Sequence, residues 1–71
     1  MAKTEEPIQL DQFLKFHGLV STGGQAKVVI QGGEVLLNGV VETRRKKKLK
    51  PGDKVTFRNR TLVVEGRDDE I

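Results

Sequence analysis

The spacing of the apolar residues changes once along the chain, near Glu34, and this change most constrains the possible folds. Before it, apolar residues recur at intervals of three and four, as in amphipathic helices: Leu10, Phe13 and Leu14, then Ala26, Val29 and Ile30. After it, short apolar runs alternate with turn residues, as in strands. We therefore predict an α+β domain in which two N-terminal helices pack on one face of a small antiparallel sheet.

Both expected helices have recognisable start and stop signals. The first carries Asp11 in its opening turn, places His17 at a core-facing position and ends at Gly18. The second begins at Thr22, with the T-x-x-Q spacing of a capping box. Gly32-Gly33 supplies its left-handed stop.

Two hairpins are expected in the second half of the chain. Asn38-Gly39 lies between apolar β-formers, which is the strongest short-range hairpin signal. A second turn is expected around Asn59-Arg60, with Asn59 in the left-handed conformation. The four expected strands are residues 35–37, 40–41, 55–57 and 61–64. A basic loop that ends in the turn signal Pro51-Gly52-Asp53 joins the two hairpins.

Positive charge is concentrated in that loop. Six of the seven residues from 44 to 50 are basic, namely Arg44, Arg45, Lys46, Lys47, Lys48 and Lys50. The whole chain carries a net charge of +3, so the residues outside this run sum to −3. Such crowding favours an anionic partner, and the arginines suit phosphate because each can donate two hydrogen bonds to it. A solvated loop that serves solubility alone is the alternative.

The start of the second helix is a second candidate phosphate site. Thr22, Gly23 and Gly24 would leave bare backbone N–H groups at the positive end of the helix dipole, with Lys27 one turn on. The alternative is that the glycines only permit a tight turn between the helices.

The composition argues against several other classes of function. The chain has no cysteine and one histidine, and its carboxylates do not cluster at a spacing that suits a metal, so we expect no metal, no cofactor, no small-molecule substrate and no catalysis. Neither a signal peptide nor a membrane-length apolar run is visible, which favours a cytoplasmic protein without membrane contact. With three Phe and no Tyr or Trp, recognition by shape and backbone is expected in place of base stacking.

Five segments together resemble the alpha-L RNA-binding motif, named after the small-subunit ribosomal protein S-four. They are residues 10–14, 18–20, 22–27, 30–39 and 51–55, and the resemblance spans residues 8–65. It is strongest to small bacterial members with TGG at the second helix and RR-x-KKL after the hairpin. Many members have arginine in place of Gly23 and histidine in place of Glu34, so part of the usual contact set differs here.

The resemblance implies a module that docks on structured RNA, with ribosomal RNA as the expected target, and we also expect the protein to be noncatalytic and monomeric. It assigns phosphate contacts to Thr22, Gly23, Gly24 and Lys27, and the basic loop would extend that surface. The expected division is a flexible N-terminus at 1–7, one RNA-binding domain at 8–65 and a flexible acidic tail at 66–71. An adaptor that binds an acidic protein is the main alternative, followed by a DNA-binding protein.

Overall fold

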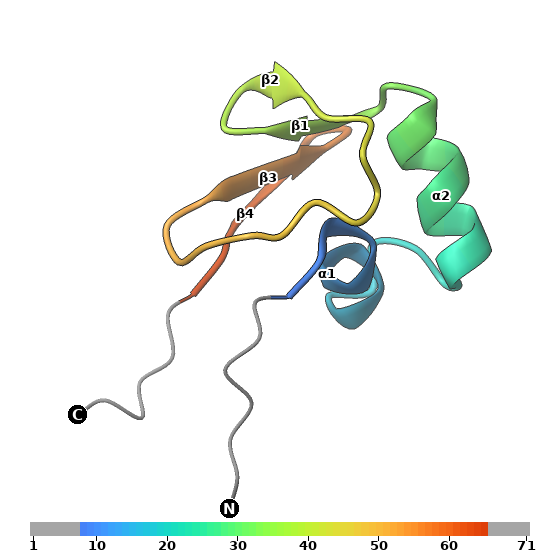
Figure 1. Cartoon of the computed structure of the whole chain (residues 1–71), viewed down its shortest axis with the longest axis horizontal. Helices are drawn as coiled ribbons and strands as arrows, with labels where there is room; N and C mark the ends of the chain where they lie inside the picture. The colour runs from blue at the N-terminus through green and yellow to red at the C-terminus, as the bar shows by residue number, and fades with distance from the viewer. Residues whose placement is uncertain (1–7, 66–71) are drawn as a thin grey trace, which may run out of the picture.

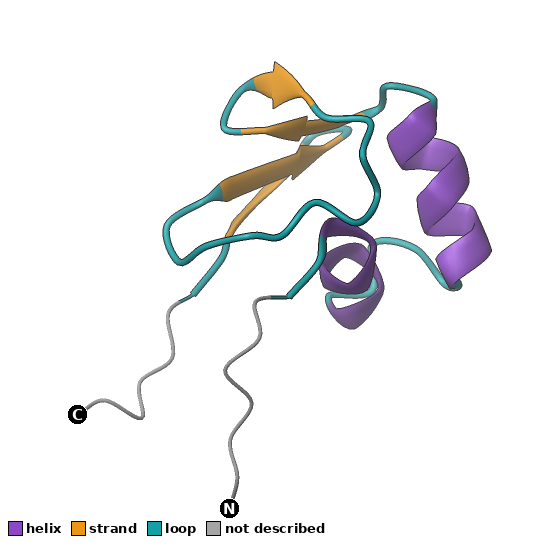
Figure 2. Cartoon of the chain, in the orientation of Figure 1, coloured by secondary structure: helices purple, strands orange, loops and turns teal. Residues whose placement is uncertain are grey.

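Two helices and a four-stranded antiparallel sheet form the fold, and a computed structural model describes residues 8–65 (Figure 1). The elements are α1 (Leu10–Phe16), α2 (Gly23–Gln31), β1 (Val35–Leu37), β2 (Val40–Val41), β3 (Lys54–Phe57) and β4 (Arg60–Val63). Figure 2 shows the helices grouped beside the sheet. This arrangement confirms the predicted α+β class and element order. The tails expected at 1–7 and 66–71 lie outside the described residues.

The strand order is β2-β1-β3-β4, which sets the path of the basic loop. Strand β1 pairs with β2 on one edge and with β3 on the other, where Val35 faces Phe57. The chain must therefore leave the β2 edge and cross to the far side of β1 before β3 can begin. Residues 42–53 make this crossing, and in Figure 1 they run from β2 past α1. The connection is thus placed against the body of the domain.

One face of the sheet supplies one side of the hydrophobic core. Val35, Leu37, Val55 and Phe57 point inward and are buried, as the period of two in a strand requires. The buried helical residues are those that the helical spacing predicts: Leu10, Phe13, Leu14, Ala26, Val29 and Ile30. On the opposite face, the Thr56 and Thr61 hydroxyls are hydrogen-bonded at 3.0 Å. The helices and the inner sheet face therefore close one core.

The helix ends follow the predicted signals with two differences. The Thr22 hydroxyl accepts a hydrogen bond from the Gln25 N–H at 3.0 Å, but the Gln25 side chain accepts from Ser21 N–H, one residue before the expected partner. Gly18 and Gly33 are left-handed, with φ of 74° and 82°. The core-facing position predicted for His17 is wrong. Because α1 ends at Phe16, His17 leaves the helical face and is exposed.

The first hairpin turn is confirmed and the second is displaced by one residue. Asn38 and Gly39 have φ of 54° and 85°, as a type I′ turn requires. In the second hairpin Phe57 pairs with Arg60, so the turn residues are Arg58-Asn59, and Arg58 takes the positive φ of 59° expected for Asn59. The Arg58 guanidinium lies 4.8 Å from the Phe57 ring centroid and 3.3 Å from the Glu34 carboxylate. These contacts offset part of the backbone strain.

Leu49 anchors the basic loop in the core, although it lies among lysines in the sequence. Its side chain is 2% exposed and belongs to the same buried cluster as the helix and strand residues. Burial of a leucine contributes about 1.5–3 kcal/mol. The loop is therefore part of the folded core.

Replacement of Leu49 by alanine should lower the free energy of unfolding by about 2–5 kcal/mol, because it leaves a cavity in a small core. Urea denaturation measures this effect. The adjacent Lys48→Ala is the matched control and should change the free energy by less than about 0.5 kcal/mol, since Lys48 is exposed. Equal effects of the two substitutions would show that Leu49 does not anchor the loop.

Candidate nucleic-acid interface

The basic segment, residues 44–50, is bound through its backbone to the start of α1. Leu10 N–H donates to the Lys47 carbonyl and Asp11 N–H to the Arg45 carbonyl, both at 2.9 Å. In the other direction, Leu49 N–H donates to the Ile8 carbonyl at 2.9 Å. The first N–H groups of a helix have no partner within the helix, so the basic segment caps α1. Its backbone is consequently held in one conformation.

Turns fix both ends of the segment. At the first, Lys47 N–H donates to the Arg44 carbonyl at 3.1 Å. At the second, Asp53 N–H donates to the Lys50 carbonyl at 3.0 Å across Pro51-Gly52, where Gly52 has a φ of 94°. A glycine with positive φ after proline is typical of a type II turn. The cations between these turns are therefore presented on an ordered backbone.

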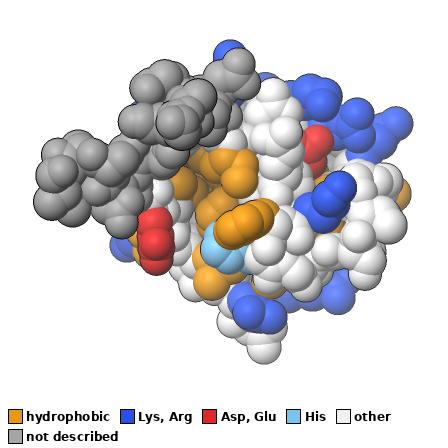
Figure 3. Space-filling model, turned by 90° about the horizontal axis from the view of Figure 1, so that it is seen from below, with side chains coloured by type: hydrophobic (Ala, Val, Ile, Leu, Met, Phe, Trp, Pro, Cys, Tyr) orange, Lys and Arg blue, Asp and Glu red, His pale blue; other side chains and the backbone are white. Residues whose placement is uncertain are grey.

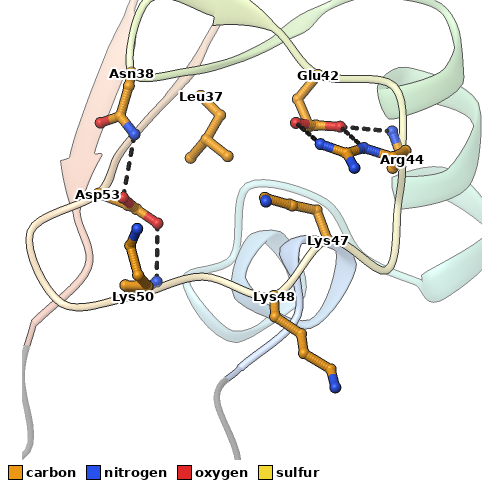
Figure 4. Close-up of a pocket in the computed structure, with 8 residues that line it drawn as sticks. All are labelled: Leu37, Asn38, Glu42, Arg44, Lys47, Lys48, Lys50 and Asp53. Atoms are coloured by element: carbon orange, nitrogen blue, oxygen red, sulfur yellow. Dashed lines mark hydrogen bonds and ion pairs between the residues drawn. The ribbon is translucent and has the colours of Figure 1, made fainter.

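A pocket of about 250 Å³ lies between the basic segment and the first hairpin (Figure 4). In Figure 4 Lys47 points into it, toward Leu37, whereas Lys48 points away from it. Four cations and two carboxylates line the pocket, which leaves a net charge of +2. The lining residues are Leu37, Asn38, Glu42, Arg44, Lys47, Lys48, Lys50 and Asp53. The residues that line the pocket are therefore positively charged overall.

Two of the predicted cations are balanced by the protein's own carboxylates. Arg44 donates two hydrogen bonds from its guanidinium to Glu42, at 2.7 and 3.2 Å, and these bonds hold the pKa of Glu42 below its usual value. Lys46 lies 3.9 Å from the Asp11 carboxylate. Within residues 8–65, no carboxylate lies within ion-pair distance of the remaining cations of the basic segment, which are Arg45, Lys47, Lys48 and Lys50. These four have the most charge to offer a ligand.

Asp53 connects the basic segment to the first hairpin. Its carboxylate accepts from Lys50 N–H at 2.8 Å and from the Asn38 side-chain amide at 3.1 Å. The same Asn38 side chain accepts from Lys54 N–H at 2.9 Å. Hydrogen bonds to the charged form, first that from Lys50 N–H, lower the pKa of Asp53. One ionised carboxylate therefore fixes the end of the basic segment.

Acid should weaken the fold partly through Asp53. Because the folded-state pKa of Asp53 is lowered, its contribution to stability is complete above the unfolded-state pKa and is lost as pH falls through the folded value. We expect the free energy of unfolding to fall as pH drops from about 5 to about 2, and less steeply in Asp53→Asn, which cannot ionise. Urea titrations across this range measure the slope. Identical slopes for parent and variant would contradict the assigned role.

The backbone at the start of α2 does not need glycine for a tight turn between the helices. Gly23 and Gly24 lie in the helix with no positive φ, and an added Cβ at either would meet no atom closer than 3.9 Å. Neither glycine is therefore required by the turn. Within the described part of the chain, the Gly23 and Gly24 N–H groups donate no hydrogen bond. These two N–H groups point out of the N-terminal end of the helix and remain available to an anion.

The predicted site residues fall into two groups. Those of the basic segment gather around α1, and Arg44, Lys47, Lys48 and Lys50 share the pocket. Thr22, Gly23, Gly24 and Lys27 line no part of that pocket, and in Figure 1 the start of α2 is the end of that helix farther from the sheet. The predicted site residues therefore lie on two separate surfaces of the domain.

Sequence reasoning missed the residues that hold the site together. Three of them make contacts between segments distant in sequence: Leu49 in the core, and Asp53 with Asn38. The fourth is Glu42, whose side chain is directed toward Arg44 by the folded path of the chain. The one available signal was an isolated leucine within a charged run. Over residues 8–65 there is no group of three or more His or acidic side chains able to hold a metal. No helix in this range has the length and apolar character needed to span a membrane.

Comparison with known proteins identifies relatives across most of the chain. The model of the S4 domain family matches residues 2–65. The sequence is 37% identical over 57 residues to YbcJ of Escherichia coli (strain K12), named "Putative RNA-binding protein", covering 80% of this chain and 81% of YbcJ. It is 44% identical over 50 residues to RlbA of Bacillus subtilis (strain 168), named "Probable ribosome maturation protein", covering 70% of each chain.

A solved structure agrees with these sequence matches. The solution structure of YbcJ from E. coli, described as revealing an alfaL motif involved in RNA binding, superposes with a TM-score of 0.68 and 32% sequence identity. The superposition covers 92% of this chain and 82% of YbcJ. The resemblance to the alpha-L motif read from the sequence is thereby confirmed.

Proposed function

Because the chain belongs to the S4 domain family, we propose that it binds structured RNA through the basic segment and the start of α2. The observation that carries this proposal is the backbone attachment of the basic segment to α1. A flexible polycation would lose conformational freedom when it binds, whereas this segment is ordered before any ligand arrives. Preorganisation of this kind favours a partner with a fixed arrangement of phosphates, such as a folded RNA.

Each of the two surfaces would bind phosphates through its own groups. Arg45, Lys47, Lys48 and Lys50 would neutralise phosphates along the segment, with Arg44 and Lys46 adding less because Glu42 and Asp11 already offset them. At α2, the Gly23 and Gly24 N–H groups and Lys27 would bind another phosphate at the positive helix end. Two surfaces on a rigid body require a matching geometry of the backbone, which double-helical or folded RNA provides.

The finer proposal is that the RNA is ribosomal. It is supported by the similarity to RlbA, whose name assigns that protein to ribosome maturation. We propose a monomeric, noncatalytic protein of the cytoplasm for which binding itself is the function. A labelled ribosomal RNA hairpin should therefore be displaced from the protein more readily by its own unlabelled form than by duplex DNA or single-stranded RNA.

Binding should be strongly salt-dependent. About five phosphate contacts, at about −0.7 to −0.9 each, predict a slope of log association constant against log salt concentration of about −3.5 to −4.5. Replacing both Lys48 and Lys50 with alanine should flatten the slope by about 1.4–1.8 units. Fluorescence anisotropy with a labelled RNA hairpin measures both values.

The matched control removes the same charge elsewhere. Arg58 and Arg60 lie at the β3–β4 turn, the opposite end of β3 from Asp53, and their double replacement with alanine should leave the slope nearly unchanged. Equal flattening in both double variants would indicate nonspecific attraction to net charge. A slope near zero for the parent protein would refute the proposal. In a pulldown experiment, capture of a partner that survives nuclease treatment would favour an acidic protein partner.

The two glycines allow a separate test of the α2 surface. In Gly23→Ala and Gly24→Ala, the helix should be stabilised by up to about 1 kcal/mol, since alanine has the higher helix propensity and the added methyl has space. The same methyl should hinder approach of a phosphate and lower RNA affinity about tenfold, the value of one charge-assisted hydrogen bond of about 1.5 kcal/mol. Higher stability with unchanged affinity would exclude this surface from the interface.

A further inference from the structure

Phe16 is exposed to an unusual degree for an aromatic residue. Its side chain is 78% accessible, whereas Phe13 and Phe57 are buried. Of the three Phe residues, Phe16 alone presents its ring to solvent, so one stacking surface is present although the composition favoured recognition by shape and backbone. A single exposed apolar side chain is normal in a folded domain, so the groups around the Phe16 ring decide whether it forms a contact surface.

The ring forms one wall of a shallow hollow on α1. Ile8, Gln12, Lys15 and Phe16 line a volume of about 410 Å³, which is within the range of about 300–1,000 Å³ typical of small-molecule sites. The hollow is largely apolar, with an amide and an ammonium group at its edge. Figure 3 shows hydrophobic side chains gathered on this face around the histidine, with Lys and Arg side chains nearby.

His17 supports the Phe16 ring from one edge. The two ring centroids are 5.1 Å apart with an interplanar angle of 89°, an edge-to-face contact. His17 in turn lies 4.4 Å, centroid to centroid, from Phe13, which is in the core. The exposed ring is thus connected to the core through His17, and this arrangement leaves much of the Phe16 ring open to solvent.

The hollow adjoins the basic segment through Ile8, one of its lining residues. The Ile8 carbonyl, at one side of the hollow, accepts from Leu49 N–H, and Gln9 pairs with Lys48 across an antiparallel bridge. Gln12 uses its Oε1 to accept from Gln9 N–H at 3.0 Å, and this bond fixes the side chain while its amide nitrogen keeps its donors. An RNA strand that follows the lysines of the basic segment would therefore pass beside the hollow.

We propose that this hollow receives an unpaired nucleobase of the RNA, stacked on Phe16. The proposal rests on the proposed function and adds a base contact to an interface otherwise made of phosphate contacts. A nucleobase matches the lining, because its face stacks on the phenyl ring, its edge accepts from the Gln12 amide, and the adjoining phosphate meets Lys15. A purely aliphatic partner would leave the amide and the ammonium group without a role.

The test compares two RNA hairpins that share one stem and differ by a single bulged nucleotide. Phe16→Leu keeps an apolar side chain but removes the stacking surface. Stacking on an aromatic ring contributes about 1–3 kcal/mol per base, so the variant should bind the bulged hairpin about 5- to 150-fold more weakly and the fully paired hairpin equally well. Val63→Ala, at another exposed apolar site, is the matched control and should alter neither affinity.

The salt slope of the variant should stay at the parent value, because no phosphate contact is removed. A 5-bromouridine placed at the bulge should cross-link on irradiation to a peptide that contains Phe16. Equal affinity of Phe16→Leu and parent for the bulged hairpin would overturn the inference and leave the proposed function intact. Failure of the parent to bind either hairpin would overturn both.

Binding of a second copy of the chain at the hollow is distinguishable from binding of a nucleobase. Concentration-dependent dimerisation in analytical ultracentrifugation that Phe16→Leu abolishes, together with unchanged RNA affinity, would assign the hollow to a second copy of the chain and overturn the inference. Cross-links that formed only at the basic segment would overturn it as well.

Discussion

The backbone hydrogen bonds between the start of α1 and the basic segment are the constraint on which the rest of the structure depends. They satisfy helix N–H groups that would otherwise lack partners. They also fix the path of residues 42–53 across the domain, which places β3 where it pairs with β1. They also bring Leu49 into the core. Because one set of bonds completes both the fold and the basic surface, the site requires no ordering step of its own. Mutual repulsion among the cations is tolerated for the same reason: their backbone positions are set by bonds that do not involve the charges.

Local signals predicted most of the fold. The helical spacing gave the buried residues of α1 and α2, and Asn38-Gly39 gave the first hairpin, because each feature depends on residues close in sequence. The second turn was misplaced because cross-strand register, with Phe57 opposite Arg60, outweighed the turn preference of Asn59. His17 was misassigned because the helix ended one residue before it. The family resemblance supplied the overall arrangement that the local signals left open.

The candidate site was predicted only in composition. The sequence indicated which residues are basic, but the pairing of Arg44 with Glu42 and the attachment of Asp53 to Asn38 depend on the folded path of the chain. The structure therefore distinguishes cations that the sequence had left equal, because carboxylates lie at ion-pair distance from Arg44 and Lys46. It also separates the α2 surface from the basic segment and adds an exposed ring. Together these features describe an ordered surface in which the proposed phosphate contacts and the proposed base contact can be removed independently.

Chemical-shift mapping of the ¹⁵N-labelled protein against a ribosomal RNA hairpin tests the central claim most directly, because it locates the interface residue by residue. If the preordered basic segment is the binding surface, the largest shifts should fall at residues 45–50 and 22–27. The Leu10 and Asp11 amides, which are bonded to that segment, should stay protected from hydrogen exchange. Shifts confined to β4 and the outer face of the sheet, or loss of protection at Leu10 and Asp11 on binding, would contradict a surface ordered in advance.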